Sequence, residues 1–419
     1  MQPILFHNAT LVTPIDHGAP LSGERQGHVR RLPRGAILSV DGIIRDVGTE
    51  TELRDRLHNA GTAFAEEDLG GGCVVPGFVD PHTHMCFAKR REEEFSMRLA
   101  GSTYLDILAA GGGILSSVRA VREASDEELL RVTMRTMASA CRHGTTTVEV
   151  KSGYGLDTGT ELRMLRVIAE AGKSGPVTVV PTFMGAHAVP LEYRDRADAF
   201  TDTIIEEMLP AVAAEGAARY CDVFCERGVF SVDQSRRILL AAEKLGLGLK
   251  IHADEVNDLG GAGLAAEVGA VSAEHLLAAS EANLARMAAS GTIAVLLPGT
   301  AYSLRKPYAR AKAMIGIHVP VALATDCNPG SCFCESMPFV IGLAVLNMGL
   351  SPEEALVAAT PNAAYAIGEE TRAGSLEAGK NADFLVLDGE SPAILAYHAG
   401  VNPVAQVYKN GRLVARNLD

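Results

Sequence analysis

Between residues 74 and 325, short apolar runs alternate with longer stretches in which apolar residues recur with the period of a helix. The apolar runs are rich in β-branched residues and have no polar face, which predicts strands buried on both sides. The first, formed by Val74, Val75, Phe78 and Val79, ends at Pro81, which cannot continue a hydrogen-bond ladder. Further strands are predicted at residues 145–150, 177–183, 220–224, 249–252, 271–275, 292–297 and 321–325, and helices at 127–142, 160–171, 231–245, 259–268 and 281–290.

This alternation predicts an α/β protein with a parallel sheet covered by helices. Eight strands are the number that closes a (β/α)8 TIM barrel, and we predict a distorted barrel of this kind. A doubly wound open sheet is the alternative. It is disfavoured because polar residues recur at the carboxyl ends of many strands, as an active site on one barrel face requires. The sequence has no Gly-x-Gly-x-x-Gly motif and no phosphate loop, and Gly111-Gly112-Gly113 predicts a loop turn.

The two ends of the chain have a different pattern, with short strands joined by tight turns. Residues 4–6, 36–40 and 43–44 predict strands near the N-terminus, and residues 383–388 and 404–414 predict strands near the C-terminus. Asp41-Gly42 and Asn410-Gly411 are strong hairpin signals in these segments. We therefore expect one small β-sandwich-like domain built from residues 1–73 and 374–419, beside a barrel formed by residues 74–373.

Length and composition limit the class of protein. The chain has 419 residues, a length that exceeds what one hydrophobic core usually supports. With 47% hydrophobic and 21% charged residues, its composition is ordinary for a soluble globular protein. The formal net charge of −13 argues against a nucleic-acid partner, and an anionic ligand would need a local basic cluster. We find no secretion signal and no membrane-spanning run, so we expect a cytoplasmic protein with no membrane partner.

The eight cysteines are scattered along the chain rather than packed into a small disulfide framework. Cys332 and Cys334 are close enough to suggest a metal site, but no second pair with zinc-site spacing accompanies them. Cys221 and Cys225 flank a predicted strand. We therefore expect reduced, structural thiols.

The most informative polar residues are His82 and His84, directly after the first barrel strand. On an extended backbone, residues i and i+2 project to the same side, so both imidazoles can face one point. Nitrogen ligands that converge at a strand end suit a first-row divalent metal.

Three later strands end in residues of the same kind. Residues 249–251 run into His252, residues 271–274 into His275, and residues 321–325 into Asp326. Three imidazoles and one carboxylate leave room for a water molecule on Zn²⁺ or Fe²⁺, and such a metal lowers the pKa of its water towards ~7. Asp326 is suited to hold the metal and accept the proton of the water, and His275 to donate to a carbonyl oxygen or act as a general acid.

This arrangement resembles the amidohydrolase superfamily, whose members carry a metal in a distorted (β/α)8 barrel. The resemblance rests on the His-x-His pair, the later-strand histidines, the last-strand aspartate, the flanking β-domain and the segment 373–383, and it covers nearly the whole chain. Within the superfamily the sequence is most similar to the imidazolonepropionases, ring-opening hydrolases of histidine degradation. The matching segments are residues 78–84, 91–95, 111–116, 149–156, 182–187, 251–255 and 326–331.

The resemblance implies a ligand set, a substrate and a reaction. One divalent metal, Zn or Fe, would be bound by His82, His84, His252 and Asp326. The anionic small molecule 4-imidazolone-5-propanoate would be hydrolysed to N-formimidoyl-L-glutamate, and we further expect a homodimer. The substrate would contact Arg91, Tyr154, His187, Glu255, Asn328, Gly330 and Ser331.

The residue types fit this substrate. Arg91 follows Lys89-Arg90 and precedes three glutamates; a solvated helix face is the ordinary explanation, yet a guanidinium there can grip a carboxylate with two hydrogen bonds. Tyr154 offers a hydroxyl, and Glu255 can recognise ring N–H groups or pass a proton to the departing nitrogen. The loop with Asn328, Gly330 and Ser331 offers side chains and amides for the new carboxylate of the product.

Two alternatives and one ambiguous residue are left open by the sequence. Another cyclic amidohydrolase or an aromatic deaminase would keep the metal residues with a different substrate pocket, whereas a non-catalytic relative would have lost ligands. Lys151 ends a strand, and binuclear relatives use a carboxylated lysine on an early strand to bridge two metals. The resemblance is to the mononuclear branch, so we interpret Lys151 as structural or as support for the ligands. The sequence also leaves open which of Asp326, His275 and Glu255 carries each proton transfer.

Overall fold

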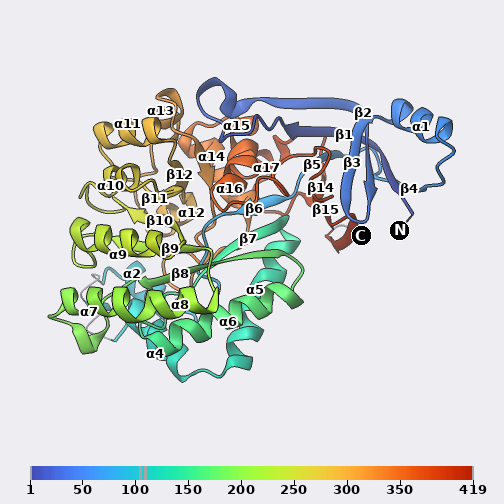
Figure 1. Cartoon of the computed structure of the whole chain (residues 1–419). Helices are drawn as coiled ribbons and strands as arrows, with labels where there is room; N and C mark the ends of the chain where they lie inside the picture. The colour runs from blue at the N-terminus through green and yellow to red at the C-terminus, as the bar shows by residue number, and fades with distance from the viewer. Residues whose placement is uncertain (1, 103–105, 108–110, 418–419) are drawn as a thin grey trace.

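The structure is a computed structural model that describes residues 2–102, 106–107 and 111–417. It contains two eight-stranded sheets, one in a barrel surrounded by helices and one in a smaller unit beside it (Figure 1). The two chain ends lie close together in the smaller unit.

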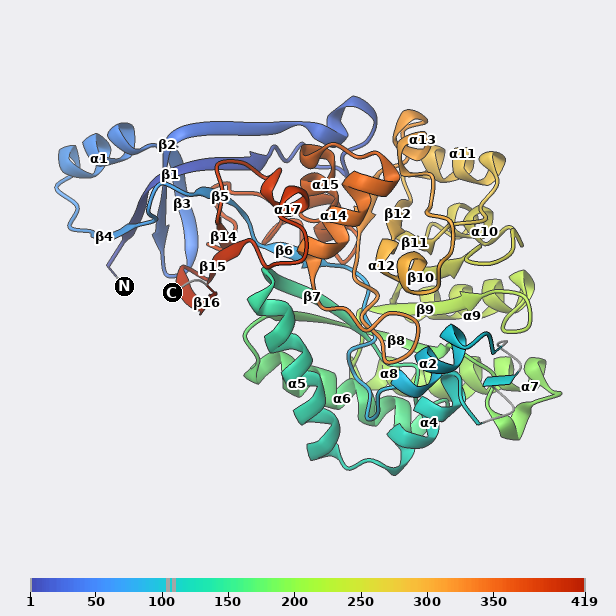
Figure 2. The same ribbon diagram turned by 180° about the vertical axis from the view of Figure 1, so that it is seen from behind.

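The barrel sheet is entirely parallel, with the strands in chain order. The helices between successive strands form its outer wall, as Figure 2 shows from behind. The predicted TIM barrel and its strand and helix positions are confirmed, with differences of a few residues at element ends. The strands are β6 (Phe78–Asp80), β7 (Thr145–Lys151), β8 (Thr178–Ala186), β9 (Tyr220–Cys225), β10 (Gly248–Ala253), β11 (Ser272–His275), β12 (Ile293–Leu296) and β13 (Val321–Leu323).

The helices that follow these strands present apolar stripes to the sheet, as amphipathic helices of this fold do. Several of these helices begin at a side-chain cap. Before α9, for example, the Ser231 hydroxyl accepts a hydrogen bond from the Gln234 backbone amide, and the Gln234 side-chain oxygen accepts one from the Ser231 backbone amide. The helices are α2 (Glu92–Leu99), α4 (Ile114–Glu123), α5 (Asp126–Arg142), α6 (Thr158–Ser174), α7 (Ala197–Thr203), α8 (Leu209–Glu215), α9 (Val232–Lys244), α10 (Gly261–Glu267), α11 (Glu281–Ser290), α12 (Pro298–Ser303), α13 (Ala311–Gly316), α14 (Met337–Met348), α15 (Pro352–Ala358), α16 (Pro361–Tyr365) and α17 (Ile394–Tyr397).

Polar contacts at the end of β6 and just beyond β13 close the barrel between its first and last strands. The carboxylate of Asp80 accepts hydrogen bonds from the backbone amide and hydroxyl of Thr325, at 3.0 and 2.5 Å. A bridge pairs Thr83 with Cys327, and the Asp326 amide donates to the carbonyl of His82 at 3.1 Å. The segments that carry the predicted ligands of the two strands are therefore fastened directly to one another.

The single strand predicted before His82 is wrong in one respect, because two strands occupy that stretch. β5 (Cys73–Pro76) pairs in the smaller sheet and β6 in the barrel, with Gly77 between them. A Cβ atom at Gly77 would lie 2.3 Å from the hydroxyl of Thr146, so only glycine permits this close passage from one sheet to the other.

Both chain ends build the smaller sheet, as predicted. Its strands are β1 (Ile4–Pro14), β2 (Val29–Val40), β3 (Ile43–Thr49), β4 (Ala65–Asp68), β5, β14 (Phe384–Leu387), β15 (Val404–Lys409) and β16 (Arg412–Arg416), with helix α1 (Glu50–Asn59) after β3. The order β16-β15-β14-β5-β1-β2-β3 joins the two ends through the β5–β14 pair, and β4 pairs with β1. The boundary expected after residue 73 falls inside β5.

The aromatic core of this sheet also comes from both ends of the chain. The ring of Phe6 lies edge-on to Phe384 and Tyr408, at centroid distances of 5.0 and 5.4 Å. Asp41 and Asn410 adopt positive φ angles of 53° and 50° in the two predicted hairpin turns, a conformation that suits these residue types. The N-terminal strands therefore depend on C-terminal strands for their packing.

Two further expectations concern the whole chain. All eight cysteines are unpaired in the structure and seven of them are buried, whereas their reduced state stays a prediction. Within the described ranges, no helix has both the length and the apolar character needed to traverse a bilayer.

Candidate metal centre and active site

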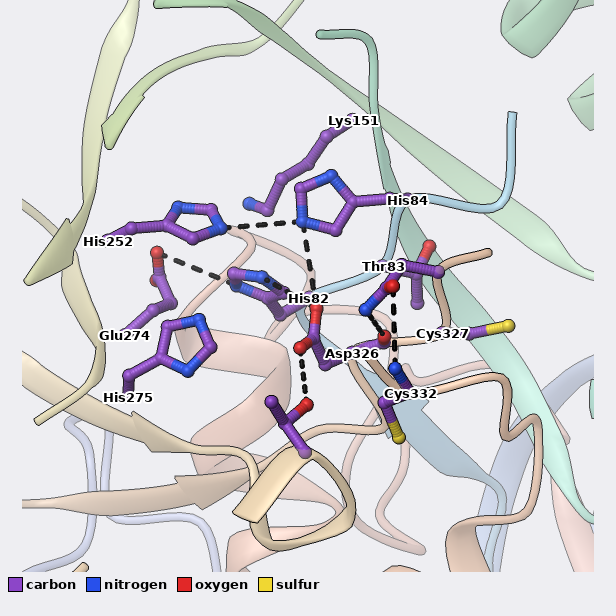
Figure 3. Close-up of polar contacts among 12 residues, drawn as sticks. His82, Thr83, His84, Lys151, His252, Glu274, His275, Asp326, Cys327 and Cys332 are labelled. Carbon is purple, nitrogen blue, oxygen red and sulfur yellow. Dashed lines mark hydrogen bonds and ion pairs between the residues drawn. The ribbon is translucent and has the colours of Figure 1, made fainter. Parts of the chain in front are cut away.

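The carboxyl ends of β6, β10 and β13 bring His82, His84, His252 and Asp326 together, as Figure 3 shows. Nε2 of His84 lies 3.4 Å from Nε2 of His252. Oδ1 of Asp326 lies 3.5 Å from Nε2 of His82 and 3.7 Å from Nε2 of His84. Four atoms about 2.0–2.1 Å from a tetrahedral zinc ion are roughly 3.4 Å apart, so these spacings fit one divalent metal.

The electrostatic state of the three histidines also suits a metal. Burial lowers the pKa of His82, His84 and His252 well below its usual value, so their rings are neutral and carry a free lone pair. Among the described residues, neither ring nitrogen of His82 has a hydrogen-bond partner, although the side chain is fully buried. Buried lone pairs directed at one another repel unless a cation lies between them, and we conclude that the donor set fits a metal.

Two partners outside the ligand set orient the ligands. Asp222, in β9, accepts a hydrogen bond from Nδ1 of His252 at 3.0 Å, which leaves Nε2 with the lone pair directed at the site. Thr300, in α12, donates its hydroxyl to Oδ2 of Asp326 and leaves Oδ1 facing the histidines. Burial raises the pKa of Asp326 to about 6, and a bound cation would lower it again.

His275 lies beside the candidate ligands. Its ring centroid is 5.3 Å from that of His252, and Nε2 is 3.8 Å from Oε2 of Glu255. The backbone of His275 has a φ angle of 71°, which is uncommon for a non-glycine residue and turns the chain immediately after β11. The two predicted acid–base groups, His275 and Glu255, are thus neighbours on the same side of the site.

A cavity of about 680 Å³ opens above these residues. It is lined by His84, His252, His275 and Asp326 and by every residue predicted to contact the substrate. The predicted substrate residues are Arg91, Tyr154, His187, Glu255, Asn328, Gly330 and Ser331. Residues from seven separate segments therefore share one space, as expected for the carboxyl-terminal face of a barrel.

Arg91 reaches this cavity from the residue that precedes α2. Its amide donates to the carbonyl of Pro329 at 2.9 Å, and its side chain is largely buried. Within the described ranges, Nε and Nη1 have no hydrogen-bond partner, and the Oε2 atom of Glu94 is 3.8 Å from Nε. A buried guanidinium with free donors in a cavity is a receptor for a carboxylate.

The loop after Asp326 is organised by the side chain of Asn328. Its Oδ1 accepts the amides of Gly330 and Ser331 at 2.9 and 2.8 Å, and its Nδ2 donates to the carbonyl of Asp326 at 2.7 Å. These amides, which we expected to be available for a carboxylate, are already used within the loop. The polar atoms of Asn328 mainly hold the loop, although the residue lines the cavity.

Tyr154 and His187 also line the cavity, with their ring centroids 5.2 Å apart. Nδ1 of His187 donates to the carbonyl of Gly153 at 2.9 Å, and the ring stacks on His84 at a centroid distance of 4.9 Å. Burial lowers the pKa of His187 to about 4, so the ring is neutral and its Nε2 is an acceptor. Burial raises the pKa of the Tyr154 hydroxyl, which therefore remains a donor.

Several residues around the site were not singled out from the sequence. Asp222 and Thr300 hold ligands, and Arg98 lines the cavity and donates to the carbonyl of Gly330 at 3.2 Å. Asp222 carried a usable signal, because it is an acidic residue inside an otherwise apolar strand. Thr300 and Arg98 lie in helices, where threonine and arginine are ordinary residues, so the sequence carried no such signal for them.

A parallel barrel with three histidines and one aspartate at its carboxyl-terminal face defines a metal-dependent hydrolase of the amidohydrolase class. The sequence profile of the amidohydrolase family matches residues 73–414. The chain belongs to this family and, within it, to the imidazolonepropionases, as its curated relatives show.

Two of these relatives span almost the whole chain. The imidazolonepropionase of Syntrophobacter fumaroxidans is 61% identical over 405 residues, which cover 97% of this chain and 95% of that protein. The imidazolonepropionase of Desulfotalea psychrophila is 58% identical and covers 98% of this chain and 99% of that protein. Among solved structures, Escherichia coli guanine deaminase has a TM-score of 0.74 at 16% identity, with both chains fully covered. The likeness to this structure shows the fold alone.

Proposed function

We propose that this protein hydrolyses 4-imidazolone-5-propanoate to N-formimidoyl-L-glutamate, with one divalent metal held by His82, His84, His252 and Asp326. The observation that carries the proposal is the buried guanidinium of Arg91, whose Nε and Nη1 have no hydrogen-bond partner among the described residues, in the same cavity as the metal-facing side chains. A substrate with a carboxylate tail and a reactive ring needs both features at once. The imidazolonepropionases at 61% and 58% identity support the same substrate.

Three residues bind and orient the substrate in this proposal. Arg91 binds the propanoate through two charge-assisted hydrogen bonds. Tyr154, which stays protonated, donates its hydroxyl to the same carboxylate or covers the ring. Neutral His187 presents Nε2 as an acceptor for a ring N–H, because its Nδ1 hydrogen is committed to Gly153.

A divalent metal held by these four residues would lower the pKa of water towards ~7 and polarise the ring carbonyl. Asp326 accepts the proton that the attacking water releases, and Thr300 holds the carboxylate in place for this role. His275 donates to the carbonyl oxygen as negative charge develops on it. Glu255, beside His275, carries a proton to the nitrogen that leaves as the carbonyl carbon–nitrogen bond breaks.

Turnover measurements on a panel of cyclic substrates test the proposal. We expect hydrolysis of 4-imidazolone-5-propanoate and little or no turnover of dihydroorotate, hydantoins or guanine, which lack the combination of ring and propanoate. Preferred turnover of guanine would instead identify an aromatic deaminase, and preferred turnover of dihydroorotate or a hydantoin would identify another cyclic amidohydrolase.

The same proposal includes three properties of the assembled protein: its metal content, its oligomeric state and its location. We expect one metal per chain, zinc or iron, measured by elemental analysis of protein purified without chelators. A homodimer is checked by light scattering, and the expected cytoplasmic location by fractionation. A small-molecule substrate requires none of the basic surface that a nucleic-acid partner would.

A further inference from the structure

Glu226 is a nearly buried carboxylate at the mouth of the barrel that the proposed reaction does not use. It follows β9 directly, lines the cavity of about 680 Å³ and is 5% exposed. A carboxylate withdrawn from water is destabilising unless hydrogen-bond donors surround it. The donors around Glu226 therefore indicate what the residue does.

Four hydrogen bonds join Glu226 to its own loop and to the loop after β10. Its Oε1 accepts the backbone amide of Arg227 and the side-chain amide of Asn257, each at 2.8 Å. Its Oε2 accepts the backbone amides of Val256 and Asn257, at 2.9 and 3.3 Å. A carboxylate has about four lone-pair positions, so these bonds occupy all of them. Glu226 is therefore part of the cavity wall rather than a group that binds a ligand.

The residues that Glu226 holds directly follow Glu255 in the sequence. β9 and β10 are parallel neighbours, so the loops that leave them lie side by side. Among the described residues, no other group accepts the backbone amides of Val256 and Asn257. The backbone of Glu226 is itself fixed in a turn, because its carbonyl accepts the amide of Val229 at 3.0 Å. The carboxylate of Glu226 thus ties this part of the neighbouring loop to a rigid support.

Glu255 is preceded by Asp254, which is also firmly held. The carbonyl of Asp254 accepts the amide of Ala278 at 2.8 Å. Its carboxylate accepts the amides of Gly261 and Ala262 at 3.0 and 2.9 Å. Glu255 therefore lies between one neighbour fixed by its own side chain and others fixed by Glu226.

The two anchors leave the side chain of Glu255 beside the other proposed acid–base group, with Oε2 3.8 Å from Nε2 of His275. We propose that Glu226 is the positioning residue for Glu255. It holds the loop so that the Glu255 carboxylate stays within reach of the nitrogen that leaves. The inference rests on the proton transfer assigned to Glu255 in the proposed function and adds the group that maintains its geometry.

A double-mutant cycle in kcat tests the inference. Glu226→Ala removes the anchor and should lower kcat by roughly 10- to 100-fold, because a misplacement of about 1 Å costs a reaction up to that much. Glu255→Gln should lower kcat by roughly 10²–10⁴-fold, the range for loss of a general acid. In the Glu255→Gln background, Glu226→Ala should cause almost no further loss, because the group that it positions is already inactive. Equal fold losses in the two backgrounds would overturn the inference.

Two further variants separate positioning from stability. Glu226→Gln keeps one oxygen that can accept two of the four hydrogen bonds, so its loss in kcat should be smaller than that of Glu226→Ala. If Glu226→Ala does not fold, the same cycle with Glu226→Gln decides between the same outcomes. Glu369 is a carboxylate with 3% exposure that binds Arg219, which directly precedes β9 at the opposite end of the barrel. Glu369→Ala should therefore lower the thermal midpoint and leave kcat unchanged.

Amide hydrogen exchange gives a readout that does not depend on the reaction. We expect residues 255–258 to exchange faster in Glu226→Ala than in the wild type, because two of their amides lose their acceptor. Unchanged exchange in this segment would overturn the inference. A wild type that does not hydrolyse 4-imidazolone-5-propanoate would instead refute the proposed function, and the exchange measurement would still decide whether Glu226 holds the loop.

Discussion

Gly330 and Arg91 fit together so closely that a methyl group at position 330 would overlap the guanidinium. A Cβ atom built on Gly330 would lie 1.4 Å from Nη2 of Arg91. The loop after β13 therefore packs against the guanidinium that we propose to bind the substrate carboxylate, and it fixes the position of this group. The backbone bond from Arg91 to the Pro329 carbonyl fixes the same two segments together.

Gly330→Ala should consequently displace the Arg91 side chain and raise KM for 4-imidazolone-5-propanoate. We expect an increase of roughly tenfold or more, since part of the ~1.5–3 kcal/mol of charge-assisted bonding is lost. Gly316→Ala is the matched control, because nothing lies within 4 Å of a Cβ atom there. Unchanged KM in Gly330→Ala, determined by steady-state kinetics, would show that the arginine accommodates the methyl group.

Arg91→Lys tests the arginine directly. A lysine keeps the charge but loses the two parallel hydrogen bonds, so KM should rise by roughly one to two powers of ten with a smaller effect on kcat. Hydrolysis of a substrate analogue without the carboxylate should be insensitive to the change. Arg90→Lys is the control, since Arg90 lies over the Phe333 ring outside the cavity. Equal losses for both substrates would show that Arg91 does not recognise the tail.

His252→Ala should remove or greatly weaken the metal and abolish turnover, because one of four ligands and the contact with Asp222 are lost together. Elemental analysis and the turnover assay measure the two effects on the same preparation. His398→Ala, an exposed histidine, should leave both unchanged. Stoichiometric metal with normal activity in His252→Ala would refute the proposed ligand set.

His275→Ala separates proton transfer from metal binding. The variant should keep its metal and lose about 10²–10³-fold in kcat, the loss typical for removal of one donor to a developing oxyanion. If the variant is purified without metal, His275 is a ligand. If kcat is near normal with bound metal, the residue is structural and Glu255 becomes the acid to test.

His187 predicts a pH dependence of stability in the metal-free protein. Above pH 6.5 its ring is neutral in both the folded and the unfolded chain. As the pH falls from 6.5 to about 4, the unfolded chain takes up a proton that the buried ring does not, so the free energy of unfolding decreases, by roughly 3 kcal/mol in full. His187→Gln should show a correspondingly shallower decrease in urea unfolding between pH 7.5 and 4.5. An identical slope in both proteins would contradict the burial argument.

The barrel and the positions of the candidate ligands could be predicted from the sequence because two simple rules apply. Strands buried on both faces are apolar throughout, and the carboxyl ends of parallel strands lie on one face of the barrel. His252 and Asp326 stand at such ends, so their proximity to His82 follows from the order of the strands.

Other features depend on local backbone geometry, which the residue pattern does not specify. The division of one apolar run into β5 and β6 results from the tight passage of Gly77 past Thr146. The Asn328 side-chain oxygen accepts hydrogen bonds from three backbone amides of its own loop, and only the folded loop shows that these amides face inward.

The fastening of β6 to β13 has a consequence for how the protein is made. His82 leaves the ribosome early and Asp326 late, with nearly the whole barrel between them, and the bridge from Thr83 to Cys327 can form only when both are present. The metal-binding site therefore stays incomplete until synthesis is almost finished, and the N-terminal strands wait equally long for β14.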